Sequence, residues 1–152
     1  MKKILFTVWC SLMVVFTMNA QTSSGNEIID EMLQEADAIT SMYEQELAKQ
    51  GIKSQIQLFF DSKKNELVYS FRVFDQRLFN NADAEYGLSE SIIGMIKSVM
   101  AEDESGNVIV AVGNQFKRTN TGMRVEYLYQ DQKKSASATA DQIIEIIYKT
   151  FQ

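Results

Sequence analysis

The sequence has 152 residues, with 15 Lys and Arg against 20 Asp and Glu, one cysteine, and neither histidine nor proline. This acidic balance, with a net charge of −5 and no basic run longer than two residues, excludes the positively charged surface of a nucleic-acid-binding protein. The missing histidine also excludes Ser-His-Asp triads, histidine proton transfer and the usual zinc sites, and the only cysteine is Cys10. We therefore assign no catalytic residue and predict neither a metal site nor a cofactor.

Residues 1–20 have the pattern of an export signal. Two lysines precede an apolar run over 4–16, and Ala20 is a small residue at a suitable cleavage point. The apolar run is shorter than the roughly 20 residues that a membrane helix needs. Cys10 lies inside this run, whereas the cysteine of a bacterial lipoprotein would close it. We predict cleavage after Ala20 and export to the periplasm or the extracellular space, with no stable membrane span in the product.

Cleavage would leave 132 residues with 13 Lys and Arg against 20 Asp and Glu, a net charge of −7. This length suits one domain with a hydrophobic core. We assign residues 21–25 to a polar leader and residues 26–152 to a single domain. Because no cysteine would remain, packing alone has to hold this exported domain together.

The domain is predicted to open with one long helix that runs to about Lys49. Ser24 and Glu27 have the spacing of a capping box at its start, and Gly51 suits its C-terminal cap. Apolar residues recur at intervals of three and four, which gives one apolar stripe on a helix. They are Ile28, Ile29, Met32, Leu33, Ala36, Ile39, Tyr43 and Leu47.

Residues Gln55 to Phe74 are predicted to form a β-hairpin with a four-residue turn over 62–65. This turn brings the apolar residues of the two arms opposite one another on one face. The pairs are Phe60 with Leu67, Leu58 with Tyr69, and Ile56 with Phe71. Because the side-chain period of a strand is two, a slip of one residue would turn the whole set to the other face.

The second face of this hairpin carries our candidates for ligand binding. They are Gln55, Gln57, Phe59, Arg72 and Phe74. Exposed aromatic and guanidinium groups of this kind are enriched at protein interfaces. If a further helix covered Phe59 and Phe74, both would be ordinary core residues, and this alternative stays open.

A polar loop with some local helix is expected over 75–87, followed by a second amphipathic helix with Ser89 as its N-cap. The stripe of this helix consists of Leu88, Ile92, Met95, Ile96 and Val99. The acidic run over 102–107 ends the helix. It lacks the alternating ligands and the terminal Glu of an EF-hand, so we do not predict calcium binding there.

Residues 108–116 and 123–129 are predicted to form a second hairpin that turns at 119–122. Apolar residues alternate along each arm, which is the period of a half-buried strand. The aligned residues are Val110, Val112 and Phe116 on the first arm and Val125, Tyr127 and Tyr129 on the second. Residues 130–138 are polar or small and are expected to form a connector.

A final helix is predicted over Ala140 to Phe151, opened by a capping box of Thr139 and Gln142. Its apolar stripe is made by Ile143, Ile144, Ile147 and Phe151. A helix this apolar must pack on the sheet or on another subunit. We predict packing on the sheet; the alternative is a homodimer contact through Ile144, Ile147 and Phe151.

The predicted order is α-β-β-α-β-β-α, which fits an α+β two-layer sandwich with helices packed on a four-stranded antiparallel sheet. No motif for a nucleophilic serine, a phosphate or a dinucleotide is present. We expect an exported bacterial binding or interaction module without catalytic activity, with an unknown protein or peptide as its partner. The alternative is a carboxylate-based hydrolase acting on an extracellular glycan. It would need two carboxyl groups about 5 to 10 Å apart in one cleft, one of them with a raised pKa.

Overall fold

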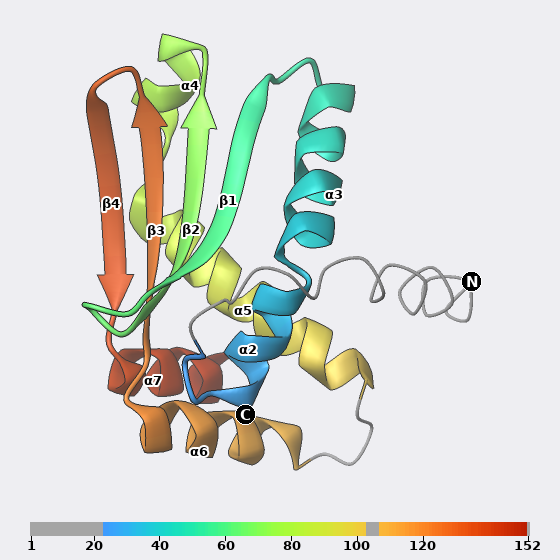
Figure 1. The fold of residues 1–152 in the computed structure, drawn as a ribbon, viewed down its shortest axis with the longest axis vertical. Helices are drawn as coiled ribbons and strands as arrows, with labels where there is room; N and C mark the ends of the chain where they lie inside the picture. The colour runs from blue at the N-terminus through green and yellow to red at the C-terminus, as the bar shows by residue number, and fades with distance from the viewer. Residues whose placement is uncertain (1–22, 103–106, 152) are drawn as a thin grey trace.

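The computed structural model describes residues 23–102 and 107–151, so the predicted export signal lies outside the described residues. The described part contains six helices and four strands (Figure 1). They are α2 (Glu27–Gln34), α3 (Ala36–Lys49), β1 (Ser54–Asp61), β2 (Glu66–Val73), α4 (Gln76–Asn81), α5 (Ala84–Glu102), α6 (Val108–Thr119), β3 (Gly122–Tyr129), β4 (Gln132–Ala138) and α7 (Ala140–Phe151). Within these ranges no helix is both long and apolar enough to span a bilayer.

The four strands form one sheet in the order β1-β2-β3-β4. The two outer pairs are antiparallel, but β2 and β3 run parallel. The prediction of an α+β fold with four strands is therefore confirmed, whereas the prediction of a purely antiparallel sheet is wrong. Parallel neighbours need a crossover connection, and here α4, α5 and α6 provide it.

The first hairpin has the predicted register. Phe60 lies opposite Leu67, Leu58 opposite Tyr69, and Ile56 opposite Phe71. The turn is fixed locally, because the carboxylate of Asp61 accepts hydrogen bonds from the backbone N–H groups of Lys63 and Lys64. Asn65 then takes a left-handed conformation with φ of 55°, which asparagine tolerates in tight turns.

The predicted strand over 108–116 is wrong, because this segment lies in helix α6. Val108, Val112 and Phe116 are all buried on one side of the helix. Their spacing of four fits one face of a helix and equally the period of a strand, so alternation could not separate the two. Gly113, which suggested a bulge, instead faces α7, and a Cβ there would lie 3.4 Å from the hydroxyl of Tyr148.

The predicted connector over 130–138 is also wrong, since most of it forms strand β4. Gln130 has a φ of 49° and occupies the short turn from β3. The strand reads QKKSASA, and Ala136 and Ala138 face the helices while Ser135 and Ser137 are exposed. Small side chains give alternation too weak to recognise in the sequence.

The first predicted helix is divided at Glu35 into α2 and α3. Asn26, not Ser24, is its N-cap, and its side chain accepts hydrogen bonds from the N–H groups of Ile28 and Ile29. Ser24 instead donates its hydroxyl to Asp30. The capping box of Ser24 with Glu27 is therefore a wrong prediction.

The second predicted helix also begins earlier than expected. It starts at Ala84, because the carboxylate of Asp83 accepts hydrogen bonds from the N–H groups of Glu85 and Tyr86. Ser89 lies inside α5 and is not its N-cap. The acidic run that was expected to end this helix falls mostly on 103–106, outside the described residues.

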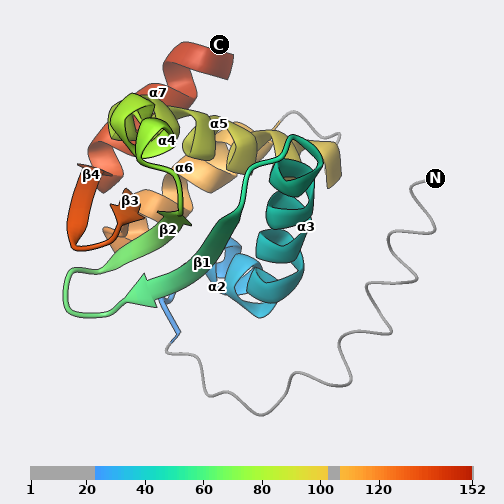
Figure 2. The same ribbon diagram turned by 90° about the horizontal axis from the view of Figure 1, so that it is seen from above.

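The described helices pack on one face of the sheet and along the β1 edge, as the view from above shows (Figure 2). The core joins one face of the strands to the apolar stripes of the helices. Its completely buried members include Leu67, Met123, Val125, Ile29, Ile92, Ile96, Phe116, Ile143 and Ile147. This layer leaves the opposite face of the sheet without a helix from the described ranges.

Helix α7 packs into this core against α6 and the sheet. The predicted capping box is confirmed, because Thr139 and Gln142 exchange backbone-to-side-chain hydrogen bonds. Ile147 is completely buried, whereas Ile144 and Phe151 keep part of their surface exposed. A homodimer contact through this helix stays a prediction, and it would have to use Ile144 and Phe151.

Neighbouring residues on opposite faces of β1 allow a direct test of this arrangement. Leu58 is buried in the core, while Gln57 is exposed. Replacing Leu58 by Ala should lower the free energy of unfolding by about 2 to 5 kcal/mol, because a cavity remains. Replacing Gln57 by Ala should change it by less than about 0.5 kcal/mol. Denaturant melts of both variants measure the difference, and equal losses would contradict the assignment of faces.

Candidate functional site

The face of the sheet turned away from the helices is the candidate site, and we call it the open face. Side chains alternate between the two faces of a strand, and the register brings the alternate residues of all four strands together. The open face consists of Gln55, Gln57, Phe59, Asp61, Glu66, Val68, Ser70, Arg72, Arg124, Glu126, Leu128, Lys133, Ser135 and Ser137. Four of the five residues selected from the sequence belong to it, and Phe74 follows directly after β2.

The five selected residues differ in exposure. Gln55 and Gln57 are exposed and Arg72 is half-buried. Phe59 and Phe74 are 38% and 51% exposed, which is unusual for large aromatic residues in a small domain. Within the described ranges, then, no helix covers either phenylalanine completely.

Two shallow hollows border the open face, and each contains two of the selected residues. The first has a volume of about 310 Å³ and lies between α3 and β1. It is lined by Ala36, Asp37, Thr40, Ile56, Gln57, Leu58 and Phe59. The second has a volume of about 250 Å³ and is lined by Arg72, Val73, Phe74, Tyr129 and Gln130. Gln55 lines neither hollow, but it lies directly opposite Arg72 in the sheet.

The Arg72 hollow, defined by the five residues around Arg72, combines a cation with aromatic rings. The side chain of Arg72 makes no hydrogen bond or ion pair with any residue in the described part of the chain. The ammonium group of Lys53 lies 5.1 Å from the ring centre of Phe74, so a second positive charge is close. The carboxylate of Asp75 is occupied, because it accepts a hydrogen bond from the N–H of Arg77 at the start of α4. This arrangement suits an anionic group with an apolar neighbour.

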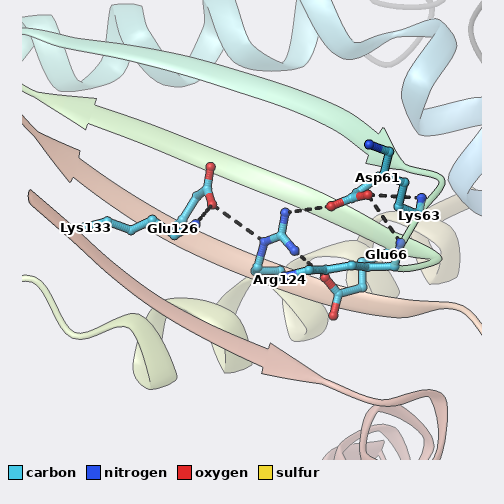
Figure 3. A network of polar contacts seen from close by, with 7 residues as sticks. Asp61, Lys63, Glu66, Arg124, Glu126 and Lys133 are labelled. Carbon is cyan, nitrogen blue, oxygen red and sulfur yellow. Dashed lines mark hydrogen bonds and ion pairs between the residues drawn. The ribbon is translucent and has the colours of Figure 1, made fainter. Parts of the chain in front are cut away.

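The opposite end of the open face carries a network of charges centred on Arg124 (Figure 3). The guanidinium group donates hydrogen bonds to Asp61 at 3.1 Å and to Glu66 at 2.5 Å. Its Nε atom lies 3.6 Å from the carboxylate of Glu126, which also binds the ammonium group of Lys133 at 3.0 Å. Arg124 is only 8% exposed, so these carboxylates compensate a charge that is costly to bury alone.

The network also shields the middle of the open face from water. Val68 lies between Phe59 and Arg124 in the sheet and is completely buried. Ser70 lies between Gln57 and Glu126 and is also buried. The long side chains of the neighbouring strands therefore lie over the short ones of β2. The exposed residues of this face lie on its two outer strands, at Gln55, Gln57 and Phe59 on β1 and at Lys133, Ser135 and Ser137 on β4.

The carboxylates of this network are poor candidates for acid–base catalysis. The hydrogen bond from Arg124 holds the pKa of Asp61 below its usual value, since it favours the charged form. A glycosidase needs a carboxylic acid with a raised pKa, and Asp61 shifts in the opposite direction. No group of three or more His, Cys, Asp or Glu side chains that could hold a metal ion is found in the described ranges.

The network residues were not selected from the sequence. Alternation along 123–129 already separates Arg124 and Glu126 from Val125 and Tyr127, so their face was predictable. Their neighbours were not, because β3 was expected to pair with residues 108–116. Only the parallel pairing of β2 with β3 brings Arg124 to Asp61 and Glu66.

Comparisons of this chain with protein-family models, curated proteins and solved structures gave no match.

The pKa of Asp61 gives a prediction about acid stability. Its folded-state pKa is lowered, so Asp61 stabilises the protein above its unfolded value of about 3.9, and this stabilisation is lost as the pH falls through the folded-state pKa. The difference in unfolding free energy between the parent and Asp61→Asn should be constant above about pH 5 and shrink toward pH 2. Denaturant melts at several pH values measure it.

Substitution at Arg124 provides the control for this prediction. The hydrogen bond from Arg124 is the main cause of the shift, so in an Arg124→Met background the same Asp61→Asn difference should depend much less on pH. A pH dependence that persists unchanged without Arg124 would contradict this assignment.

Proposed function

We propose that the chain is an exported bacterial binding module without catalytic activity, and that it holds a protein partner on the open face of its sheet. In this proposal the Arg72 hollow receives a carboxylate of the partner, and Phe74 and Tyr129 contact the apolar group beside it. The partner is a polypeptide segment with an acidic side chain or a free C-terminus next to an apolar residue.

One observation supports the proposal above the others. Arg72 is half-buried and lines a hollow together with Phe74 and Tyr129, yet its side chain has no hydrogen-bond or ion-pair partner among the residues that the structure describes. Arg124 differs in this respect, because its guanidinium group contacts three carboxylates. A half-buried arginine that the chain itself leaves unpaired can form a bidentate ion pair with an incoming carboxylate.

The charge distribution on the open face agrees with such a partner. Lys53 and Arg72 lie at one end, where a third basic group, Lys133, is paired with Glu126, and Asp61 and Glu66 lie at the other end. The charge of Arg124 is already compensated by both carboxylates at the acidic end. A ligand carboxylate is therefore attracted mainly to the end that carries Arg72. Gln55 and Gln57 beside it offer amide groups for hydrogen bonds to an extended backbone.

The alternative of a carboxylate-based hydrolase acting on a glycan receives less support. It needs a free carboxylic acid, but the carboxylates that the open face brings together are all held in ion pairs. The lowered pKa of Asp61 also disfavours proton donation. We therefore retain the binding function as the proposal.

Selection of peptides from a displayed random library tests the proposal, because it does not require the partner to be identified first. Peptides selected on the parent protein should be enriched in Asp, Glu or a free C-terminal carboxylate next to an apolar residue. Their affinity for Arg72→Ala should fall about tenfold to a hundredfold, since a charged hydrogen bond is worth about 1.5 to 3 kcal/mol. Isothermal titration calorimetry with synthetic copies of the selected peptides measures these affinities.

Two further variants serve as controls. Lys117→Ala removes one positive charge from an exposed position on α6, away from the open face, and should bind like the parent. Arg72→Lys keeps the charge but loses the planar fork, so its affinity should lie between those of the parent and Arg72→Ala. The proposal fails if the selected peptides bind Arg72→Ala as tightly as the parent, or if Lys117→Ala weakens them equally.

A further inference from the structure

The two edges of the sheet differ in whether a helix covers their backbone groups. Helix α3 lies along the outer edge of β1, and the carboxylate of Glu44 accepts a hydrogen bond of 2.6 Å from the N–H of Ile56 (Figures 1 and 2). Strand β4 forms the other edge and is the outermost strand on its side of Figure 1. Helices α5 and α7 contact it, but no described helix makes a hydrogen bond to its outer backbone edge. An open edge of this kind is a template for pairing with another strand.

Hydrogen bonding across the sheet determines which groups of β4 face outward. The N–H of Ile56 turns away from β2, so the residues of β1 on either side of it bond to β2. The N–H of Gly122 donates to the carbonyl of Asn65, which fixes the same alternation between β2 and β3. The backbone groups of Met123, Val125 and Tyr127 therefore point toward β4, where they pair with Ala138, Ala136 and Lys134. The residues that alternate with these partners, Lys133, Ser135 and Ser137, direct their backbone groups outward.

The two lysines of β4 are both bound within the chain, so their charges do not prevent another strand from pairing at this edge. Lys133 binds Glu126 at 3.0 Å. The ammonium group of Lys134 donates to the carbonyl groups of Phe79 and Asn80 at 2.8 Å and of Ala82 at 3.2 Å. Exposed lysines on edge strands normally discourage pairing, but both are engaged within their own chain. The rest of the strand carries only serine, alanine and one glutamine.

We propose that β4 pairs with β4 of a second copy of this chain in antiparallel orientation, with the two-fold axis at Ser135. This register places Ser135 opposite Ser135 and Lys133 opposite Ser137, so each outward-facing residue can exchange both of its backbone hydrogen bonds. It also places Lys134 opposite Ala136. No two like charges lie directly opposite each other, so the strand is complementary to itself.

Symmetry favours a second copy over an unrelated strand. Pairing through β4 joins two four-stranded sheets into one sheet of eight strands, whose outer edges are both β1 strands beside α3. A two-fold contact of this kind is closed, so it produces a dimer and not a fibre. The open faces of the two copies would become continuous across the junction. Because the seven-residue β4 makes a small interface, we expect a dimer that dissociates on dilution.

Sedimentation velocity of the purified exported chain, from about 10 μM to about 1 mM, tests the proposal. The parent should change from monomer to dimer over this range. Ser135→Lys places two positive charges at the axis and should weaken association about fivefold or more at low salt. Ser135→Glu should weaken it likewise. An equimolar mixture of the two variants should recover association, because opposite charges then face each other.

Matched variants separate this interface from others. Gln132→Lys adds the same charge to an exposed position whose backbone faces β3, and it should associate like the parent. Ser135→Pro removes an outward-facing N–H without breaking the ladder to β3, and it should be a folded monomer by circular dichroism. A parent that stays monomeric up to about 1 mM overturns the proposal. A dimer that resists Ser135→Lys and Ser135→Pro but dissociates with Phe151→Ser overturns it in favour of a contact through α7.

Discussion

The parallel pairing of β2 with β3 is the constraint on which the rest of the structure depends. Parallel neighbours cannot be joined by a tight turn, so the chain leaves β2, passes through α4, α5 and α6, and re-enters the sheet at β3. These helices pack on one face, and the other face is left to side chains. Asn65 fixes the point of entry. Its carbonyl accepts from the N–H of Gly122, and its amide group donates to the carbonyls of Thr119 and Asn120.

The open face results from this pairing. An arginine is partly or fully buried at each of its two ends, and the two arginines differ in their partners. At one end Arg124 is enclosed, and three carboxylates from three strands compensate its charge. At the other end Arg72 lies in a hollow with aromatic side chains and has no such partner in the described part of the chain. The first arrangement compensates a buried charge within the chain, whereas the second leaves a guanidinium group without a partner carboxylate in the described part of the chain. This difference is the physical basis for proposing a binding role for one end alone.

Local patterns in the sequence were sufficient for the first hairpin and for α7. Leu58 and Tyr69 pair as predicted because the turn and the alternation of both arms agree on one register. Residues 108–116 misled the prediction because a spacing of four satisfies the periods of both helix and strand. Strand β4 was missed because Ser and Ala give little contrast between its faces. Arg72 and Phe74 could be selected from the sequence, but the Arg124 network could not, because it depends on pairing between strands about 60 residues apart.

The most direct test of this account is a nuclear Overhauser spectrum of the folded chain, because it reports the partner of β3. We predict cross-strand contacts between Leu67 and Met123 and between Tyr69 and Val125, together with sequential amide contacts typical of a helix through 108–119. The contradictory result is an extended backbone over 108–116 whose contacts pair it with 123–129. That result would make the sheet antiparallel throughout and would separate Arg124 from Asp61 and Glu66.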